Sequence, residues 1–259
     1  MAGVEHIERG DIFFFYRPRV EKTEVHSRDD VQRFFMLLAP KQPEKSYRLF
    51  VVGRKKLPQA DGGGQRSERR NWALNVLTSK KPTTVRDELS AVTYETKTRG
   101  ERHLPAATPV GEGRYELLRH DGHTELAYAL ELPEEIGRAQ EEFEVHEEGS
   151  FILSVKNPDV SAPGLPEPPR PPAYPKKLKA KFGGRRWIDA DDPKLLDYEN
   201  SELLILGGRA RDVQEELGID IDEEAERIHT AEVCRELRVS CERDPIEPLV
   251  EGEFPESEL

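Results

Sequence analysis

Cysteine and long apolar runs are both scarce in this chain of 259 residues. The only cysteines are Cys234 and Cys241, which on one helix would lie about 10 Å apart along the axis, too far for a disulfide. No apolar run approaches the roughly 18 uncharged residues of a membrane span, and the residues after Met1 lack the regions of a signal peptide. We therefore expect a cytoplasmic protein that is not embedded in a membrane.

Apolar residues are also few, at 36%, whereas charged residues reach 35%. Typical globular chains contain about 45–50% apolar and about 25% charged residues. The chain is still long enough for one large domain or two small ones with a hydrophobic core. The composition therefore predicts a modest core beneath a heavily ionised surface.

The net charge of −12 is distributed unevenly along the chain. Residues 187–259 carry 23 acidic and 7 basic side chains, whereas residues 1–186 carry 28 acidic and 32 basic ones. The body is thus mildly basic and the C-terminal third strongly acidic. A basic body suits an anionic partner such as nucleic acid, while the acidic end would compete with that partner. The alternative is that both regions are solvated surface.

Short β-favouring segments dominate the first 156 residues. Asp121-Gly122 joins two of them and favours a tight type I′ turn, which would place His120 opposite His123. Few stretches have helical spacing, so we expect an α+β protein that is rich in β-structure. Its sheet would be mainly antiparallel, either a partly open barrel or an open layer with a few helices. The other predicted strands cover residues 12–16, 33–38, 47–52, 72–77 and 149–155.

Proline content divides the chain after this β-rich part. Eight prolines lie between Pro158 and Pro175, and such a segment favours an extended, semi-rigid conformation. We therefore expect four parts, of which the third contributes a strand at 201–206 and two helices that pack back on the sheet. They are a β-rich domain at 1–156, a proline-rich strap or linker at 157–176, the strand and helices at 177–243, and an acidic disordered tail at 244–259.

Two basic segments are candidates for binding an anion. One follows the proline-rich part and combines cations with an aromatic ring on which a base could stack. The other lies directly after a predicted apolar strand. The alternative is that these cations pair with neighbouring acids on a solvated surface. The candidate residues are Lys177, Lys179, Lys181, Arg185, Arg186 and Trp187 in the first segment, and Arg54, Lys55 and Lys56 in the second.

A second hypothesis is a metal-dependent phosphodiester hydrolase. On a strand, Glu95 and Lys97 would share one face, a spacing with which some nucleases hold a divalent metal and orient a water. Asp87 would supply a further carboxylate, and His103 lies close in sequence. Because a three-residue Glu-x-Lys pattern is common by chance, a surface ion-pair ladder is the alternative.

Other chemistry has little support in the sequence. His120 and His123 lack the further ligands of a zinc site, and neither cysteine belongs to a Cys-x-x-Cys pair. No phosphate-binding glycine loop or nucleophile elbow occurs, so we predict no cofactor and no resident metal. Binding is favoured over catalysis. A third possibility is a scaffold that contacts other proteins through sheet edges or the proline-rich strap.

Overall fold

In the computed structural model, most strands belong to one nine-stranded antiparallel sheet. The structure describes residues 4–22, 24–42, 44–60, 67–120, 122–165, 167–208, 213–217, 219, 221, 237 and 246–255. A two-stranded hairpin is separate from this sheet. The sheet contains β1 (Glu5–Pro18), β2 (Val31–Pro40), β3 (Tyr47–Val52), β4 (Arg70–Ser79), β7 (Thr108–His120), β8 (His123–Leu132), β9 (Glu148–Lys156), β10 (Trp187–Asp189) and β11 (Glu202–Gly207), and the hairpin consists of β5 (Val92–Thr96) and β6 (Gly100–Leu104).

The main sheet closes into an eight-stranded barrel. Its strand order is β9-β11-β4-β3-β2-β1-β7-β8, and β8 pairs again with β9, while β10 lies outside the ring on β9. The β-rich, mainly antiparallel fold is thus confirmed, including the pairing of His120 with His123. The barrel is closed, however, and helices are few, so the prediction of an α+β fold with a partly open barrel is only partly correct. Closure depends on β11, which comes from beyond the proline-rich segment and fills the gap between β9 and β4.

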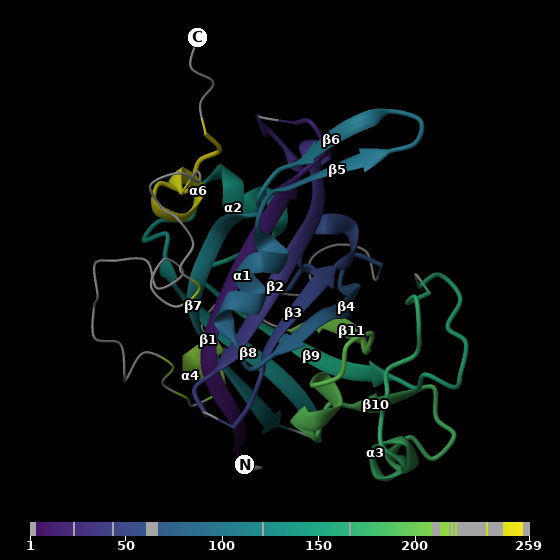
Figure 1. The fold of residues 1–259 in the computed structure, drawn as a ribbon. Coiled ribbons are helices and arrows are strands. Elements are labelled where there is room, and N and C mark those ends of the chain that lie inside the picture. The colour runs from purple at the N-terminus through teal and green to yellow at the C-terminus, as the bar shows by residue number, and fades with distance from the viewer. Residues whose placement is uncertain are drawn as a thin grey trace.

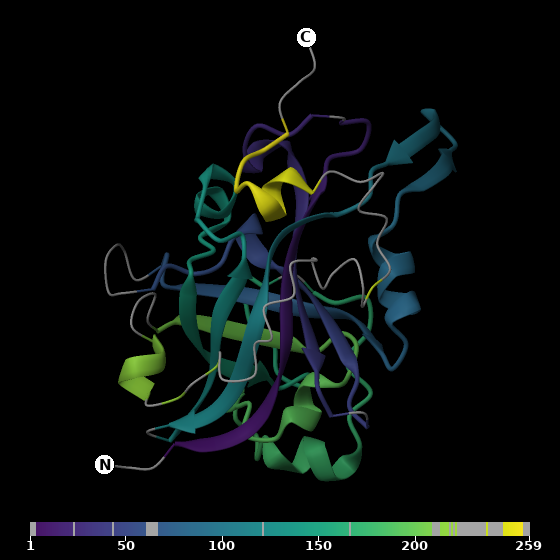
Figure 2. The ribbon, with the colours of Figure 1, turned by 90° about the vertical axis from the view of Figure 1, so that its left-hand side faces the viewer.

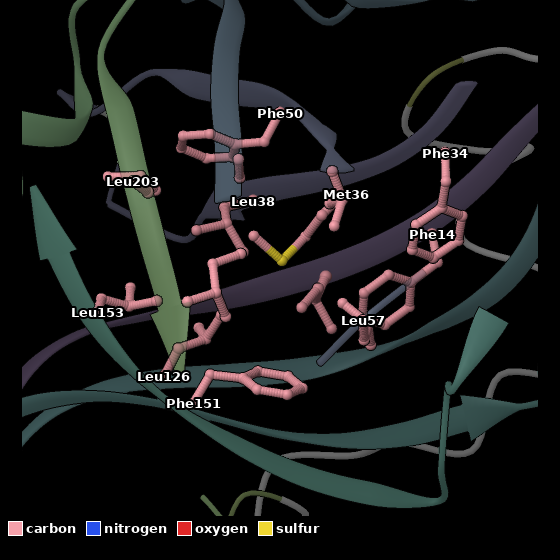
Figure 3. Close-up of a cluster of buried hydrophobic side chains, with 14 of the residues drawn as sticks. Phe14, Phe34, Met36, Leu38, Phe50, Leu57, Leu126, Phe151, Leu153 and Leu203 are labelled. Carbon is pink, nitrogen blue, oxygen red and sulfur yellow. The ribbon is translucent and has the colours of Figure 1, made fainter. Parts of the chain in front are cut away.

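Alternate side chains of the strands fill the barrel. Along β1, the inward residues are Ile12, Phe14 and Tyr16. The Phe14 ring stacks on that of Phe34, with ring centroids 6.1 Å apart. An eight-stranded barrel is just wide enough to be filled in this way, so the groups accessible to a partner lie on the surface and at the barrel ends. Figure 3 shows Phe14 and Phe34 together with Met36, Leu38, Phe50, Leu57, Leu126, Phe151, Leu153 and Leu203.

β1 and β2 are buried on both faces. Their outward side chains, among them Phe13 and Phe35, pack against Val85 and Leu89 of helix α1 (Pro82–Leu89). Figure 1 shows α1 lying across β1, β2 and β3. Burial on both faces explains why these strands are continuous apolar runs in the sequence and do not alternate with polar residues.

The two ends of the barrel carry different helices. In Figures 1 and 2, α2 and α6 lie at the end drawn uppermost. α3 lies at the lower end, which is also the end at which the N-terminus is drawn. The backbone N–H of Leu57, just after η2, donates to the oxygen of Phe143 in α2, so η2 is also at the upper end. No helix among the described residues is long and apolar enough to cross a membrane. The remaining helices are η1 (Arg28–Asp30), η2 (Gly53–Lys55), α2 (Arg138–Phe143), α3 (Lys176–Lys181), η3 (Pro193–Leu196), α4 (Val213–Leu217) and α6 (Glu247–Val250).

The acidic C-terminal segment differs from the prediction of a disordered tail. Residues 246–255 contain α6 and pack at the upper end, where Leu249 is fully buried. The ring of Phe254 lies edge-on to Tyr16 and Phe143, with centroids 5.8 and 6.2 Å away. Apolar side chains within the acidic stretch therefore anchor it. Most of residues 218–243, where the second expected helix falls, and both cysteines lie outside the described residues.

Candidate functional site

A left-handed turn follows β3 at residues Gly53–Lys56, and we call it the cationic turn. Arg54 and Lys55 both have positive φ angles, 49° and 56°. The backbone N–H of Lys56 donates to the oxygen of Gly53, 3.3 Å away. Residues with a side chain adopt this conformation at an energetic cost, and turns of this type usually contain glycine, asparagine or aspartate. Strain of this kind occurs preferentially at functional sites.

Neighbouring residues of β4 hold the cationic turn in place. The side-chain amide of Asn71 donates to the backbone oxygens of Gly53, at 2.5 Å, and of Lys56, at 2.7 Å. A Cβ atom on Gly53 would lie only 2.5 Å from the ring of Trp72, so the glycine permits a close backbone approach. The guanidinium of Arg54 also donates to the oxygen of Ser67, 2.7 Å away. The surroundings therefore fix the turn and the direction in which its cations leave it.

Lys55 is within electrostatic range of two arginines and one aspartate from the connection between β1 and β2. Burial, followed by the charge of Arg19, lowers the pKa of Lys55; Arg28 acts in the same direction and Asp29 opposes them. No salt bridge joins Lys55 or Arg19 to an acid among the residues that the structure describes. We call Arg19, Arg28 and Lys55 the cationic cluster. Its positive charge is only partly compensated within the protein.

Other cations at the upper end do have acidic or carbonyl partners. The amine of Lys56 lies 3.0 Å from a carboxylate oxygen of Glu144, and that of Lys22 lies 3.0 Å from Asp30. The guanidinium of Arg28 donates to the backbone oxygen of Glu142, and the Glu142 carboxylate accepts from the backbone N–H of Arg28 at 3.2 Å, so an acid lies beside this arginine. The excess positive charge is therefore localised at the cationic cluster and does not extend over the whole end of the barrel.

The other predicted basic segment, Lys177–Trp187, lies at the opposite end of the barrel. Helix α3 carries it at the lower end in both views, whereas Lys56 contacts the residue that follows α2 at the upper end. Arg54, Lys55 and Lys56 therefore do not share one surface with Lys177–Trp187.

Internal pairing also distinguishes the α3 segment from the cationic cluster. Lys179 pairs with Asp159 at 3.2 Å, and Lys181 pairs with Asp192 at 3.3 Å. Arg185 donates to the backbone oxygen of Lys181 at the end of the helix. Lys177 and Arg186 are exposed and have no salt bridge to a described residue, and Trp187 is half-buried on the edge strand β10. Pairing with nearby acids, the alternative stated for this segment, accounts for two of its five cations.

The residues of the hydrolase hypothesis are divided between helix α1 and the β5–β6 hairpin. Asp87 is on α1 and pairs with Arg86, while Glu95 is on β5, directly opposite Glu101 on β6. Lys97 lies in the hairpin turn, and His103 lies at the other end of β6. No group of three histidine, cysteine, aspartate or glutamate side chains within the described ranges is arranged to hold a metal ion. The geometry therefore gives the hydrolase hypothesis no support.

The most deeply buried charges lie inside the barrel, near its lower end. Arg48 of β3 and Glu8 of β1 form a fully buried bidentate pair, with nitrogen–oxygen distances of 2.6 and 3.0 Å. The Arg48 Nε donates to Asp197, and Tyr115 and Lys45 donate to Glu8. Burial alone would raise the pKa of Glu8, but Arg48 and the other donors outweigh it and hold that pKa below 4.5. Because its partners are internal, we assign this network to the interior of the fold and not to a binding site.

No family model, curated protein or solved structure matches this chain. We therefore infer its function from its own residues. Arg54–Lys56 are recognisable in the sequence because three consecutive cations follow an apolar strand. Arg19 and Arg28 are not, since isolated cations in a connection between strands form no local pattern, and only the fold brings them within electrostatic range of Lys55.

Proposed function

We propose that the protein binds a phosphate-bearing polymer, a nucleic acid, through the cationic cluster. One observation carries this proposal. Lys55 lies in a strained turn held by Asn71, is within electrostatic range of Arg19 and Arg28, which Asp29 only partly offsets, and has no salt bridge to a described residue. A phosphate group placed here would compensate the repulsion between the three cations, and release of its counterions would favour binding.

The overall charge of the protein makes this proposal specific. A net charge of −12 repels a polyanion at long range, so any binding has to come from a local excess of cations. The cationic cluster has such an excess, whereas part of the α3 segment is neutralised by its own acids. Binding should therefore depend on the upper end of the barrel.

The test compares two charge reversals that change the net charge equally. One variant combines Arg19→Glu with Lys55→Glu at the upper end, and the matched control combines Lys177→Glu with Arg186→Glu near α3. Fluorescence anisotropy with a labelled oligonucleotide gives the affinity at several salt concentrations. All four positions are at least partly exposed, so both variants should fold.

We expect the wild type to bind with an affinity that falls as salt rises. The upper-end variant should lose binding and show a slope of log affinity against log salt that is smaller by about 1–2, the value for one or two lost phosphate contacts. The control should lose much less, through the general change in charge. Equal losses in both variants, or no binding by the wild type at low salt, would contradict the proposal.

A further inference from the structure

The β5–β6 hairpin projects from the upper end of the barrel and belongs to a sheet of its own (Figure 2). Both of its strands are largely exposed. Val92 and Tyr94 of β5 are 44% and 40% exposed. They are two of the three large hydrophobic side chains that are exposed among the described residues. An exposed aromatic ring on a projecting ribbon is a surface available to a partner.

The two faces of the hairpin differ in charge. Residues directly opposite each other in an antiparallel pair point to the same face. The register pairs Tyr94 with Arg102, and this face carries no carboxylate from either strand. The other face contains Glu95 opposite Glu101. A polyanion would therefore meet the face that carries the aromatic ring and the guanidinium, and it would be repelled by the opposite face.

Hydrogen bonds connect the hairpin to the loop that carries Arg19. The backbone N–H of Glu21 donates to the oxygen of His103 at 2.9 Å, and the N–H of His103 donates to the Glu21 carboxylate at 2.8 Å. The same carboxylate lies 3.2 Å from the Nε of Arg102, so it orients this guanidinium and partly neutralises it. Arg19, two residues before Glu21, belongs to the cationic cluster. The base of the hairpin is thus anchored close to that cluster.

The tip of the hairpin adds further positive charge. Lys97 and Arg99 are exposed in the turn and have no salt bridge to a described residue. The hydroxyl of Thr96 shapes this turn, since it donates to the oxygen of Gly100 and accepts from the N–H of Arg99, both at 3.1 Å. Two exposed cations therefore lie in the turn that follows the strand of Tyr94.

We infer that the partner is a single-stranded nucleic acid whose unpaired bases stack on Tyr94. This inference rests on the proposed function and specifies its partner. An exposed ring flanked by cations is the combination with which proteins bind single strands, because the ring contacts a base face and the cations contact the backbone. In a duplex the base faces are covered by stacking, so the ring of Tyr94 would have no equivalent contact.

The experiment measures binding of a labelled 12-nucleotide single strand, and of the duplex of the same sequence, by fluorescence anisotropy. The variants are Tyr94→Ala, which removes the ring, and Tyr94→Phe, which keeps it. Glu95→Gln is the control on the opposite face of the same hairpin. These side chains are exposed, so none of the substitutions should affect folding of the barrel.

We expect tighter binding to the single strand than to the duplex. Tyr94→Ala should weaken single-strand binding about tenfold, whereas Tyr94→Phe and Glu95→Gln should bind like the wild type. Binding that depends on Lys55 but is unaffected by Tyr94→Ala, or that favours the duplex, overturns the inference and leaves the proposed function intact. If the wild type binds neither oligonucleotide, both are overturned.

Discussion

Arg48 and Lys55 lie on or just after the same strand, yet they occupy opposite electrostatic situations. Arg48 is fully buried and donates to Glu8 and Asp197. Lys55 is only partly buried, lies in a left-handed turn and is within electrostatic range of Arg19 and Arg28. The first cation is compensated inside the barrel, whereas the second has no salt bridge to a described residue, and we propose that a partner compensates it. Burial and partners, and not charge alone, therefore separate a structural cation from a candidate binding cation.

Removing one side of the buried pair should have the largest effect. Glu8→Gln leaves the Arg48 guanidinium buried with Asp197 as its remaining acidic partner, and we expect a loss of about 3–5 kcal/mol in the free energy of unfolding. Urea denaturation measures this loss. Glu8→Leu combined with Arg48→Met should recover most of it, since apolar replacements of a buried pair are often neutral or stabilising. A double variant as unstable as Glu8→Gln would contradict the explanation that the loss comes from the uncompensated charge of Arg48.

Acid should weaken the same network by protonation. The folded protein holds the pKa of Glu8 below its ordinary value of 4.5, because Arg48, Lys45 and Tyr115 stabilise the carboxylate against the opposing effect of burial. The contribution of Glu8 to stability is therefore complete above pH 4.5 and is lost as the pH falls through the lower folded value. Thermal unfolding as a function of pH should show this loss in the wild type. The loss should be smaller in the double variant, which has no titrating group at position 8.

Gly53→Ala should disturb the cationic turn. The new Cβ would lie 2.5 Å from the Trp72 ring and 2.6 Å from the Asn71 side-chain oxygen, so the turn or the strand has to shift. We expect a loss of about 1–3 kcal/mol in stability, together with weaker oligonucleotide binding. Unchanged stability and binding would show that the close packing of Gly53 against Asn71 and Trp72 is not needed for either.

Lys55→Asn should have the smallest effect on stability, and in the opposite direction. Asparagine tolerates the left-handed conformation better than lysine, and the substitution removes a cation that Arg19 and Arg28 repel. We expect the free energy of unfolding to increase by up to about 1 kcal/mol, while oligonucleotide binding becomes weaker. Lower stability together with unchanged binding would mean that Lys55 serves the fold and not a partner.

The sequence was most informative where local chemistry determines structure. Asp121-Gly122 correctly predicted the hairpin between β7 and β8, and the apolar runs correctly predicted an antiparallel sheet. Closure of the barrel was not predictable, because it depends on β11 inserting between β9 and β4, a long-range pairing without a local signal. The segment around Phe254 was taken for a disordered tail because its acids outnumber the few apolar residues that anchor it.

The candidate site was predictable only in part for a similar reason. Arg54–Lys56 form a visible run of cations, but the positive φ angles and the approach of Arg19 and Arg28 follow from the fold. The burial of Arg48 does have a signal in the sequence. Side chains alternate between the faces of a strand, so Arg48 points to the same side as the inward residues Phe50 and Val52. A cation at an inward position of a strand predicts a buried partner, although it does not identify Glu8 as that partner.

The most direct test of the account is the pKa of Lys55 itself, measured by NMR of its ammonium group with and without a single-stranded oligonucleotide. In the free protein, burial and the neighbouring arginines should keep this pKa below 10.5. A bound phosphate stabilises the charged amine, so the pKa should rise when the oligonucleotide binds. A bound complex in which the pKa of Lys55 stays at its free value would contradict the claim that a partner compensates this charge.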